Sequence, residues 1–265
     1  MTDAVDRLEG VPESGRARLE QNKAGLFTSD LSVNEYLLVE DAGYEPLGLV
    51  LGTSIYHLGY QRRRWLRSHE LEVLSEALYH ARELAMHRME EEAADLGADG
   101  IVGVRLEVRG FGSRAHTAEF VAVGTAVRRR GAAPSAARPF TSDLSGQDFW
   151  TLLRTGSRPV GLVMGSCVYA VTYRGPRAAI TQAFRNVELP LFTQALYDAR
   201  ELAMTRMQRE AEHLAADGIV GVELAEHGHG WKGRVVEFFA IGTAIVRDPS
   251  AKRLPSPSPV IDLSG

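Results

Sequence analysis

Three side chains between residues 80 and 87 could bind a metal ion. His80, Glu83 and His87 are separated by three and four residues, so on a helix they lie close to one face. Imidazole and carboxylate ligands suit a borderline ion such as zinc or nickel better than a soft ion. A solvated helix face is the favoured alternative, because charged residues and histidines commonly line exposed helix surfaces.

A second metal candidate is the pair His227 and His229, which lie in the sequence Glu-His-Gly-His at a predicted hairpin turn. A polar turn that binds nothing is the favoured alternative. Soft heavy metals prefer thiolates, and the chain has only one cysteine, Cys167, so one chain cannot build a thiolate site. The only cofactor that these residues suggest is a divalent metal ion.

No catalytic signature accompanies these residues. The sequence has neither a Gly-x-Ser-x-Gly turn, which would carry a nucleophilic serine, nor a His-Glu-x-x-His zinc motif. A hydrolase whose residues meet only in the folded chain stays open but has no support in the sequence. We therefore predict a protein that is not an enzyme.

An arginine-rich segment, residues 62–67, is the only feature that points to nucleic acid. Its arginines could bind phosphates while Trp65 stacks on a base. Pairing of the arginines with carboxylates such as Glu70 and Glu72 at a subunit contact is the favoured alternative. The whole chain has 30 basic and 34 acidic residues and a net charge of −4, which gives no general attraction to nucleic acid. Nucleic acid is therefore not an expected partner.

The elements that position these residues occur twice in the chain. Residues 77–89 recur as residues 195–207 with two positions changed, and residues 98–104 recur unchanged as residues 216–222. Both blocks return 118 residues further along, whereas the opening segment, Phe-Thr-Ser-Asp-Leu-Ser at residues 27–32, returns 113 residues later at residue 140. Such self-similarity indicates two tandem copies of one structural unit.

Each unit has the pattern of one long helix packed on a small sheet. In the first unit, apolar residues recur in steps of three and four from Leu71 to Leu96, which predicts a helix that ends at Gly97. Residues 47–56, 101–108 and 120–127 are rich in β-branched residues and predict strands. The glycines in residues 47–56 predict a bulge or a close approach of backbones rather than a phosphate loop. The fold class is therefore α+β, with two tandem copies of a small antiparallel sheet packed on one long helix.

Composition divides the chain into five parts. Residues 1–25 and 248–265 are predicted to be a flexible arm and a Pro/Ser-rich flexible tail, residues 26–128 and 139–247 the two units, and residues 129–138 a linker. The single cysteine and the absence of an export signal predict a cytoplasmic protein. No apolar run approaches the roughly 20 residues that a membrane span needs, so no membrane contact is expected.

The repeated motifs resemble the YbjQ-like family of bacterial proteins, a family named for heavy-metal binding. The resemblance rests on Ala-Arg-Glu-Leu-Ala at residues 81–85, Gly-Ala-Asp-Gly-Ile-Val-Gly-Val at residues 97–104, Gly-Thr-Ala-Val at residues 124–127, and their second copies. It implies a dodecin-like or YbjQ-like α+β unit, assembly into pentameric rings, and no established reaction. The chain departs from the family by joining two units, and by placing residues 61–67 and 174–177 where the family has a Gly-Gly-Arg-Ser-like segment.

The last strand of each unit is apolar on both faces. In residues 120–127 and 238–246 apolar side chains point to both faces, and one helix covers only one face of a sheet. The two units can cover each other, which would permit a monomer, but this leaves sheet edges open. We therefore expect a closed homo-oligomer that serves as a binding or scaffold module, with five chains implied by the family resemblance. Residues 260–263, at the end of the tail, offer an apolar anchor for a protein partner.

Overall fold

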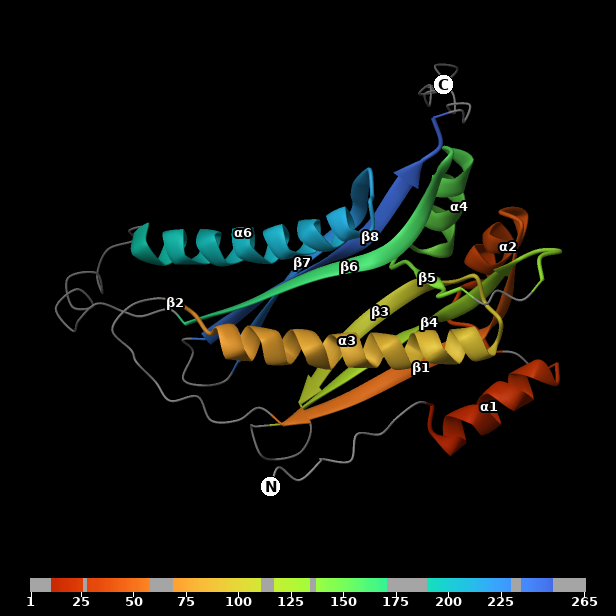
Figure 1. Cartoon of the computed structure of the whole chain (residues 1–265), viewed down its shortest axis with the longest axis horizontal. Coiled ribbons are helices and arrows are strands. Elements are labelled where there is room, and N and C mark those ends of the chain that lie inside the picture. Colours follow the sequence, from red (N-terminus) through yellow and green to blue (C-terminus); the bar gives the residue numbers. More distant parts are fainter. Residues whose placement is uncertain are drawn as a thin grey trace, which may run out of the picture.

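The computed structural model describes residues 11–25, 28–57, 69–110, 117–133, 137–170, 190–229 and 235–249. These residues form two four-stranded sheets, each with one long helix packed along it (Figure 1). The strand order is β1-β4-β3-β5 in the first sheet and β2-β6-β8-β7 in the second. The predicted α+β fold of two similar units is confirmed.

A short helix, a strand, a long helix and two strands follow one another in both units. The elements of the first unit are α1 (Glu13–Lys23), α2 (Val33–Asp41), β1 (Tyr44–His57), β2 (His69–Glu70), α3 (Glu72–Asp95), β3 (Gly100–Gly110) and β4 (Thr117–Arg129). Those of the second are β5 (Phe140–Thr141), α4 (Gly146–Arg154), β6 (Ser157–Ala170), α6 (Pro190–His213), β7 (Gly218–His229) and β8 (Val235–Arg247). The short helices α2 and α4 begin where their serine caps predict, because Ser32 and Ser145 accept hydrogen bonds from the backbone of Glu35 and Asp148.

Each long helix packs closely on its own sheet because a strand glycine lies beneath it. A Cβ atom on Gly52 of β1 would lie 2.0 Å from the carbonyl oxygen of Ala85, and one on Gly165 of β6 would lie 2.0 Å from that of Ala203. Register shifts follow Pro46 and Pro159 at the start of the same strands. The glycines thus mark a bulge and a close approach of backbones, as predicted.

Helix α3 has a second buried face that the apolar stripe did not predict. Besides the alanines and leucines that face the first sheet, Ser75, Arg82 and Met86 are buried. The core around α3 also includes Val168 of β6 and Val235 of β8, so α3 packs on both sheets. Figure 1 shows α3 lying between the strands of the first sheet and β6. One unit therefore covers part of the other.

Two short strands cross between the units. β2, which belongs to the first unit in sequence, pairs with the end of β6, and β5 of the second unit pairs in parallel with the start of β3. The edge of each sheet is thus completed by the other unit. The two units form one body through shared sheets rather than through side-chain packing alone.

Helix α1 lies inside the range that the sequence analysis assigned to a flexible arm. Arg18 of α1 donates one hydrogen bond to the carbonyl oxygen of Leu49, at 2.5 Å, and pairs with Glu92 of α3. These contacts are polar and join distant parts of the chain, so hydrophobic periodicity could not reveal them. Within the described part, no helix has the length and apolar character that a membrane crossing requires.

The close approach at Gly165 generates a stability prediction. We expect Gly165→Ala to lower the free energy of unfolding by roughly 1–3 kcal/mol, because α6 must move away from β6 to admit the new methyl group. Urea unfolding followed by circular dichroism measures this change. Gly161→Ala on the same strand is the control, since its Cβ would meet only the end of the Leu214 side chain. Equal losses in the two variants would contradict the close-approach explanation.

Candidate functional site

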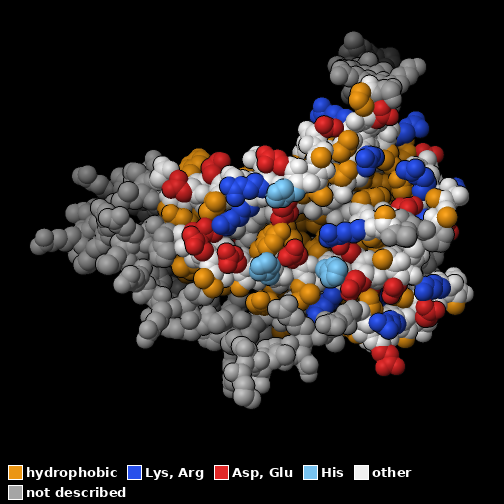
Figure 2. Space-filling model, in the orientation of Figure 1, with side chains coloured by type: hydrophobic (Ala, Val, Ile, Leu, Met, Phe, Trp, Pro, Cys, Tyr) orange, Lys and Arg blue, Asp and Glu red, His pale blue; other side chains and the backbone are white. Residues whose placement is uncertain are grey.

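The structure brings together two of the three residues first proposed as metal ligands. His80 Nδ1 lies 3.2 Å from Glu83 Oε2 on the exposed side of α3. His87 lies one turn further on and contacts Glu91 instead, with 3.4 Å between Nε2 and Oε1. The described residues contain no group of three or more metal-binding side chains. In Figure 2 the histidines on this face lie singly among acidic and basic side chains.

The second candidate pair lies on a strand rather than in a turn. β7 extends to His229, so His227 and His229 are in register with Glu237 and Val235 of β8. The expectation of a hairpin turn at these residues was wrong, because the strand pairing continues through the polar sequence. His227 Nδ1 is buried and has no hydrogen-bond partner within the described residues.

Cys167 is buried inside the second unit. Burial, followed by the nearby carboxylate of Glu70, raises the pKa of this thiol to about 12. The sulfur is therefore protonated at neutral pH, and a protonated thiol is a poor nucleophile and a poor metal ligand.

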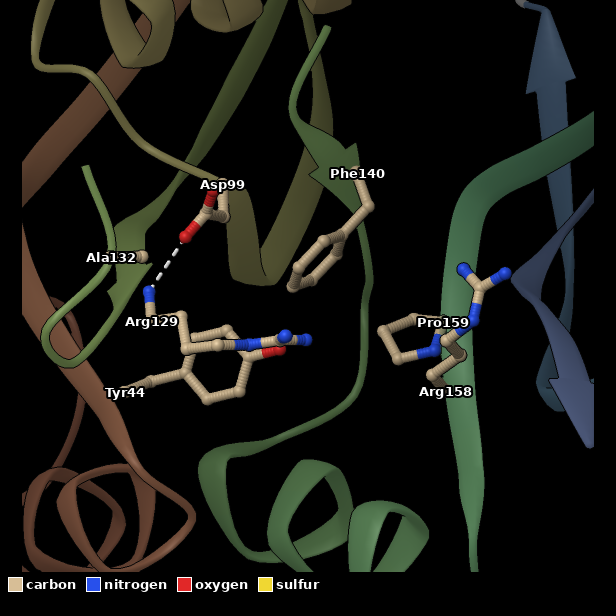
Figure 3. Close-up of a pocket in the computed structure, with 7 residues that line it drawn as sticks. All are labelled: Tyr44, Asp99, Arg129, Ala132, Phe140, Arg158 and Pro159. Atoms are coloured by element: carbon tan, nitrogen blue, oxygen red, sulfur yellow. Dashed lines mark hydrogen bonds between the residues drawn. The ribbon is translucent and has the colours of Figure 1, made fainter. Parts of the chain in front are cut away.

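One small cavity lies where the two units meet. It has a volume of about 250 Å³, and its lining includes Tyr44, Arg129, Phe140 and Arg158. Figure 3 shows Tyr44, Arg129 and Phe140 facing Arg158 and Pro159 across the open space. Asp99, which also lines the cavity, accepts a 2.7 Å hydrogen bond from the backbone of Arg129. The described lining contains two arginines, a tyrosine and an aspartate, and no serine, cysteine or histidine.

The most deeply buried ion pair among the described residues joins the two units. Arg82 Nη1 of α3 donates to Glu237 Oε1 of β8 at 2.6 Å, and each side chain is only 1% exposed. The guanidinium also lies over two aromatic rings, 5.3 Å from the centre of Phe120 and 4.2 Å from that of Phe239. Ser166 of β6 donates a further hydrogen bond to the same Glu237 oxygen, at 2.8 Å. This buried ion pair fixes α3 against the second sheet.

Hydrogen bonds on either side of this ion pair extend the contact. Tyr79 of α3 donates to Glu210 of α6, and burial is the main cause that raises the pKa of this carboxyl group. Ser75 accepts a 2.9 Å bond from the backbone N–H of Val168. Arg206 of α6 donates to Glu70 of β2, with 2.5 Å between Nη1 and Oε1. Glu70 was expected to pair with residues 62–67, which lie outside the described residues.

The opening segment of the second unit completes the contact through its backbone. The N–H groups of Gly103 and Val104 on β3 donate to the carbonyl oxygens of Leu144 and Ser142, at 3.0 and 2.9 Å. In return, Phe140 and Ser142 donate to the carbonyl oxygens of Asp99 and Ile101, at 3.1 and 2.9 Å. We call residues 140–144 the opening of the second unit, and residues 28–31, the described part of its counterpart, the opening of the first unit.

The sequence analysis missed this interface, although one signal was present. Arg82 and its counterpart Arg200 each follow directly after an alanine of the apolar stripe, so a charged residue recurs beside the buried face of both helices. Burial of Arg82 depends on Glu237, 155 positions away in the chain. Periodicity within one helix cannot reveal a partner at that distance.

Comparison with known proteins gives the family. A family described as "Putative heavy-metal-binding", YbjQ, matches residues 44–130 and 154–248, which together span both units. The chain belongs to the YbjQ family. Each matched region holds one long helix and three strands of one sheet, so the family unit corresponds to one half of this structure.

Individual relatives show both the single and the tandem form. "Encapsulin nanocompartment protein Rv1762c" of Mycobacterium tuberculosis is 48% identical over 241 residues, which cover 89% of this chain and 92% of that protein. A UPF0145 protein of Pseudothermotoga lettingae is 41% identical over 98 residues, which cover 33% of this chain and 88% of that protein. A UPF0145 protein of Halorubrum lacusprofundi is 40% identical over 89 residues, covering 32% of this chain and 81% of that protein. The single-unit relatives are thus about one repeat long.

The buried ion pair predicts a large effect of single substitutions. Arg82→Met should lower the free energy of unfolding by about 3–5 kcal/mol, because it leaves Glu237 charged and buried without its cation. The double variant Arg82→Met with Glu237→Met should recover most of the loss, since it removes both charges and keeps the volume apolar. Urea unfolding of the two variants and the unsubstituted chain measures this difference. A double variant as unstable as the single one would contradict a role for the ion pair.

Proposed function

We propose that this chain is a non-enzymatic protein that assembles with copies of itself and serves as a scaffold or binding module. The observation that carries the proposal is a difference in burial between identical residues. The sequence Ala-Asp-Gly-Ile-Val-Gly-Val occurs in β3 and again in β7, yet Val104 is 2% exposed and Val222 is 42% exposed. In the first unit this edge is covered by the opening of the second unit, and in the second unit nothing in the described chain covers it.

The remaining exposed apolar side chains support the same proposal. On the first unit they include Leu51 and Ile55 of β1, and on the second unit Tyr197 and Leu224. Each large apolar side chain gains about 1.5–3 kcal/mol when it is buried, so a protein that leaves several exposed gains stability by covering them. The name of the tandem relative from Mycobacterium tuberculosis refers to a nanocompartment, a type of assembly, which agrees with the proposal.

The assembly proposal predicts the mass in solution. We expect light scattering at micromolar concentration to give a defined multiple of 29.0 kDa, because a contact that repeats from chain to chain closes into a ring when its rotation allows. The family resemblance suggests five chains, which would hold ten units. A mass near 29.0 kDa would contradict assembly, whereas another defined multiple would contradict only the number of chains.

Binding of a divalent metal ion is a second candidate function. It is supported by the family description and by the contact between His80 and Glu83 on the exposed side of α3. His87 would have to turn from Glu91 toward them, which an exposed side chain does readily. His227 and His229 form the weaker alternative on β7, where His227 Nδ1 has no partner in the described structure. Two histidines and a carboxylate provide suitable ligands for zinc or nickel.

A titration tests this second function. If α3 holds the metal, zinc binding to untagged protein should weaken at least tenfold in the double variant His80→Ala with His87→Ala, because two of three ligands are lost. Isothermal calorimetry measures the affinity. His213→Ala, which removes another exposed helix histidine, is the control. Equal zinc affinity in all three proteins would exclude a site on α3.

Three further expectations from the sequence remain proposals. The tail, residues 248–265, is proposed to hold a protein partner, and all of it after residue 249 lies outside the described residues. The cytoplasmic location and the absence of nucleic acid as a partner also rest on composition alone.

A further inference from the structure

We propose that β7 of one chain binds the opening of the first unit, residues 28–31, of a second copy of this chain. The contact would repeat between chains the one that joins β3 to the opening of the second unit within each chain. The inference rests on the proposed self-assembly and specifies which surfaces meet. It follows from the repeat, because the groups of the internal contact that are compared below have counterparts in the other unit.

The edge of β7 has the same backbone groups as β3, but no described segment pairs with it. Gly221 and Val222 correspond to Gly103 and Val104, and they fall in the bulge where β7 has no register partner on β8. Gly221 also keeps the left-handed backbone of its counterpart, with φ of 67° against 64° for Gly103. β7 is the last strand in its sheet among the described residues. Its free N–H and C=O groups therefore form a ready edge for one more segment.

The opening of the first unit is already held in the shape that the contact needs. Ser29 and the backbone N–H of Asp30 contact the hydroxyl of Thr125, at 3.2 and 3.1 Å. In the second unit, Ser142 and Asp143 contact Thr243 in the same way, at 3.0 and 3.1 Å. Because the segment is fixed before it binds, little conformational entropy is lost on association.

The opening of the first unit is also the more exposed of the two. Thr141 and Ser142 are buried against β3, whereas their counterparts Thr28 and Ser29 are exposed and partly exposed. This segment is held in place by Thr125 and exposed, so its backbone N–H and C=O groups can pair with the edge of β7. The two unsatisfied surfaces thus lie on opposite units of one chain, as a head-to-tail contact requires.

A second set of side chains, on α6 and β1, supports the same contact between chains. Inside the chain, α3 of the first unit covers Met164 and Val168 of β6, which are 7% and 0% exposed. Their counterparts on β1, Leu51 and Ile55, are 36% and 53% exposed. The counterpart of α3 is α6, whose Tyr197 takes the place of Tyr79 and is 56% exposed. When β7 of one chain meets the opening of the next, α6 of the first chain therefore covers β1 of the second.

A charge pair completes the match. The counterparts of the buried pair Arg82 and Glu237 are Arg200 of α6 and Glu119 of β4. Arg200 lies over the ring of Phe238 at 5.2 Å, as Arg82 lies over Phe120 at 5.3 Å. Arg200 is partly exposed, and its carboxylate contact within the chain is with Glu226 at 3.6 Å. Between chains, Arg200 of one copy is placed to pair with Glu119 of the next.

A charge exchange tests this contact on the full-length chain. Glu119→Arg alone and Arg200→Glu alone should each raise the concentration of half-dissociation about tenfold or more, because like charges then meet at the contact. The double variant Glu119→Arg with Arg200→Glu should restore assembly, since it exchanges the two charges. Sedimentation velocity over a concentration series measures the dissociation. Glu212→Arg, on an exposed position of α6, is the matched control and should change nothing.

Substitution of a glycine on β7 provides an independent test that should leave the fold of the single chain unchanged. A Cβ on Gly100 would lie 2.2 Å from the ring of Phe140, whereas one on the counterpart Gly218 meets no atom within 4 Å. Gly218→Val should therefore leave the folded chain intact, as judged by circular dichroism, and weaken assembly by filling the space that the second copy needs. The first-unit counterpart of Phe140 is Phe27, which lies outside the described residues.

The outcomes separate this inference from the proposed function. An unsubstituted chain that stays at 29.0 kDa overturns both. An unsubstituted chain that assembles, together with Gly218→Val and single charge variants that assemble equally well, overturns only the placement of residues 28–31 on β7. Loss of assembly in the single charge variants without recovery in the double variant also overturns the pairing of Arg200 with Glu119.

Discussion

The buried ion pair between Arg82 and Glu237 is the interaction on which the arrangement of the two units depends. Both side chains are 1% exposed, and an ion taken out of water is stable only when an opposite charge and further hydrogen bonds compensate it. Arg82 belongs to α3 and Glu237 to β8, so this requirement holds the helix of one unit against the sheet of the other. Helix α3 therefore has a second buried face. The short strands β2 and β5, which pair with strands of the other unit, extend the same contact.

Because the units repeat, the contact within the chain has an equivalent pair of surfaces elsewhere on the same chain. The two units share the motifs that form the contact, but within the described chain only the edge of β3 and the opening of the second unit pair with each other. No described residue covers the edge of β7 as the opening of the second unit covers that of β3, which explains why identical residues such as Val104 and Val222 differ in exposure. A head-to-tail contact of this kind continues from chain to chain until it closes. Because each chain contributes two units, a ring built this way has an even number of units.

Local patterns in the sequence predicted the helices, the strands and the repeat, but not the contacts between residues far apart in the chain. The spacing of apolar residues from Leu71 to Leu96 and the serine caps concern residues within a few turns of each other, so the helices, the strands and the repeat could be predicted. Burial of Arg82 and the crossing of β2 and β5 depend on residues more than 30 positions away, and no local pattern encodes them. The candidate metal residues were chosen by spacing on one helix face, but His87 contacts Glu91, which spacing alone could not predict.

Amide hydrogen exchange of β7 in the assembled protein tests the central claim, that the contact inside the chain is repeated between chains, most directly. Within the chain, the N–H groups of Gly103 and Val104 donate to the opening of the second unit, and such bonds slow exchange. If the opening of the first unit of another copy binds β7, the N–H groups of Gly221 and Val222 should exchange about as slowly as those of Gly103 and Val104. Rapid exchange of Gly221 and Val222 in a protein shown to be assembled would contradict the account.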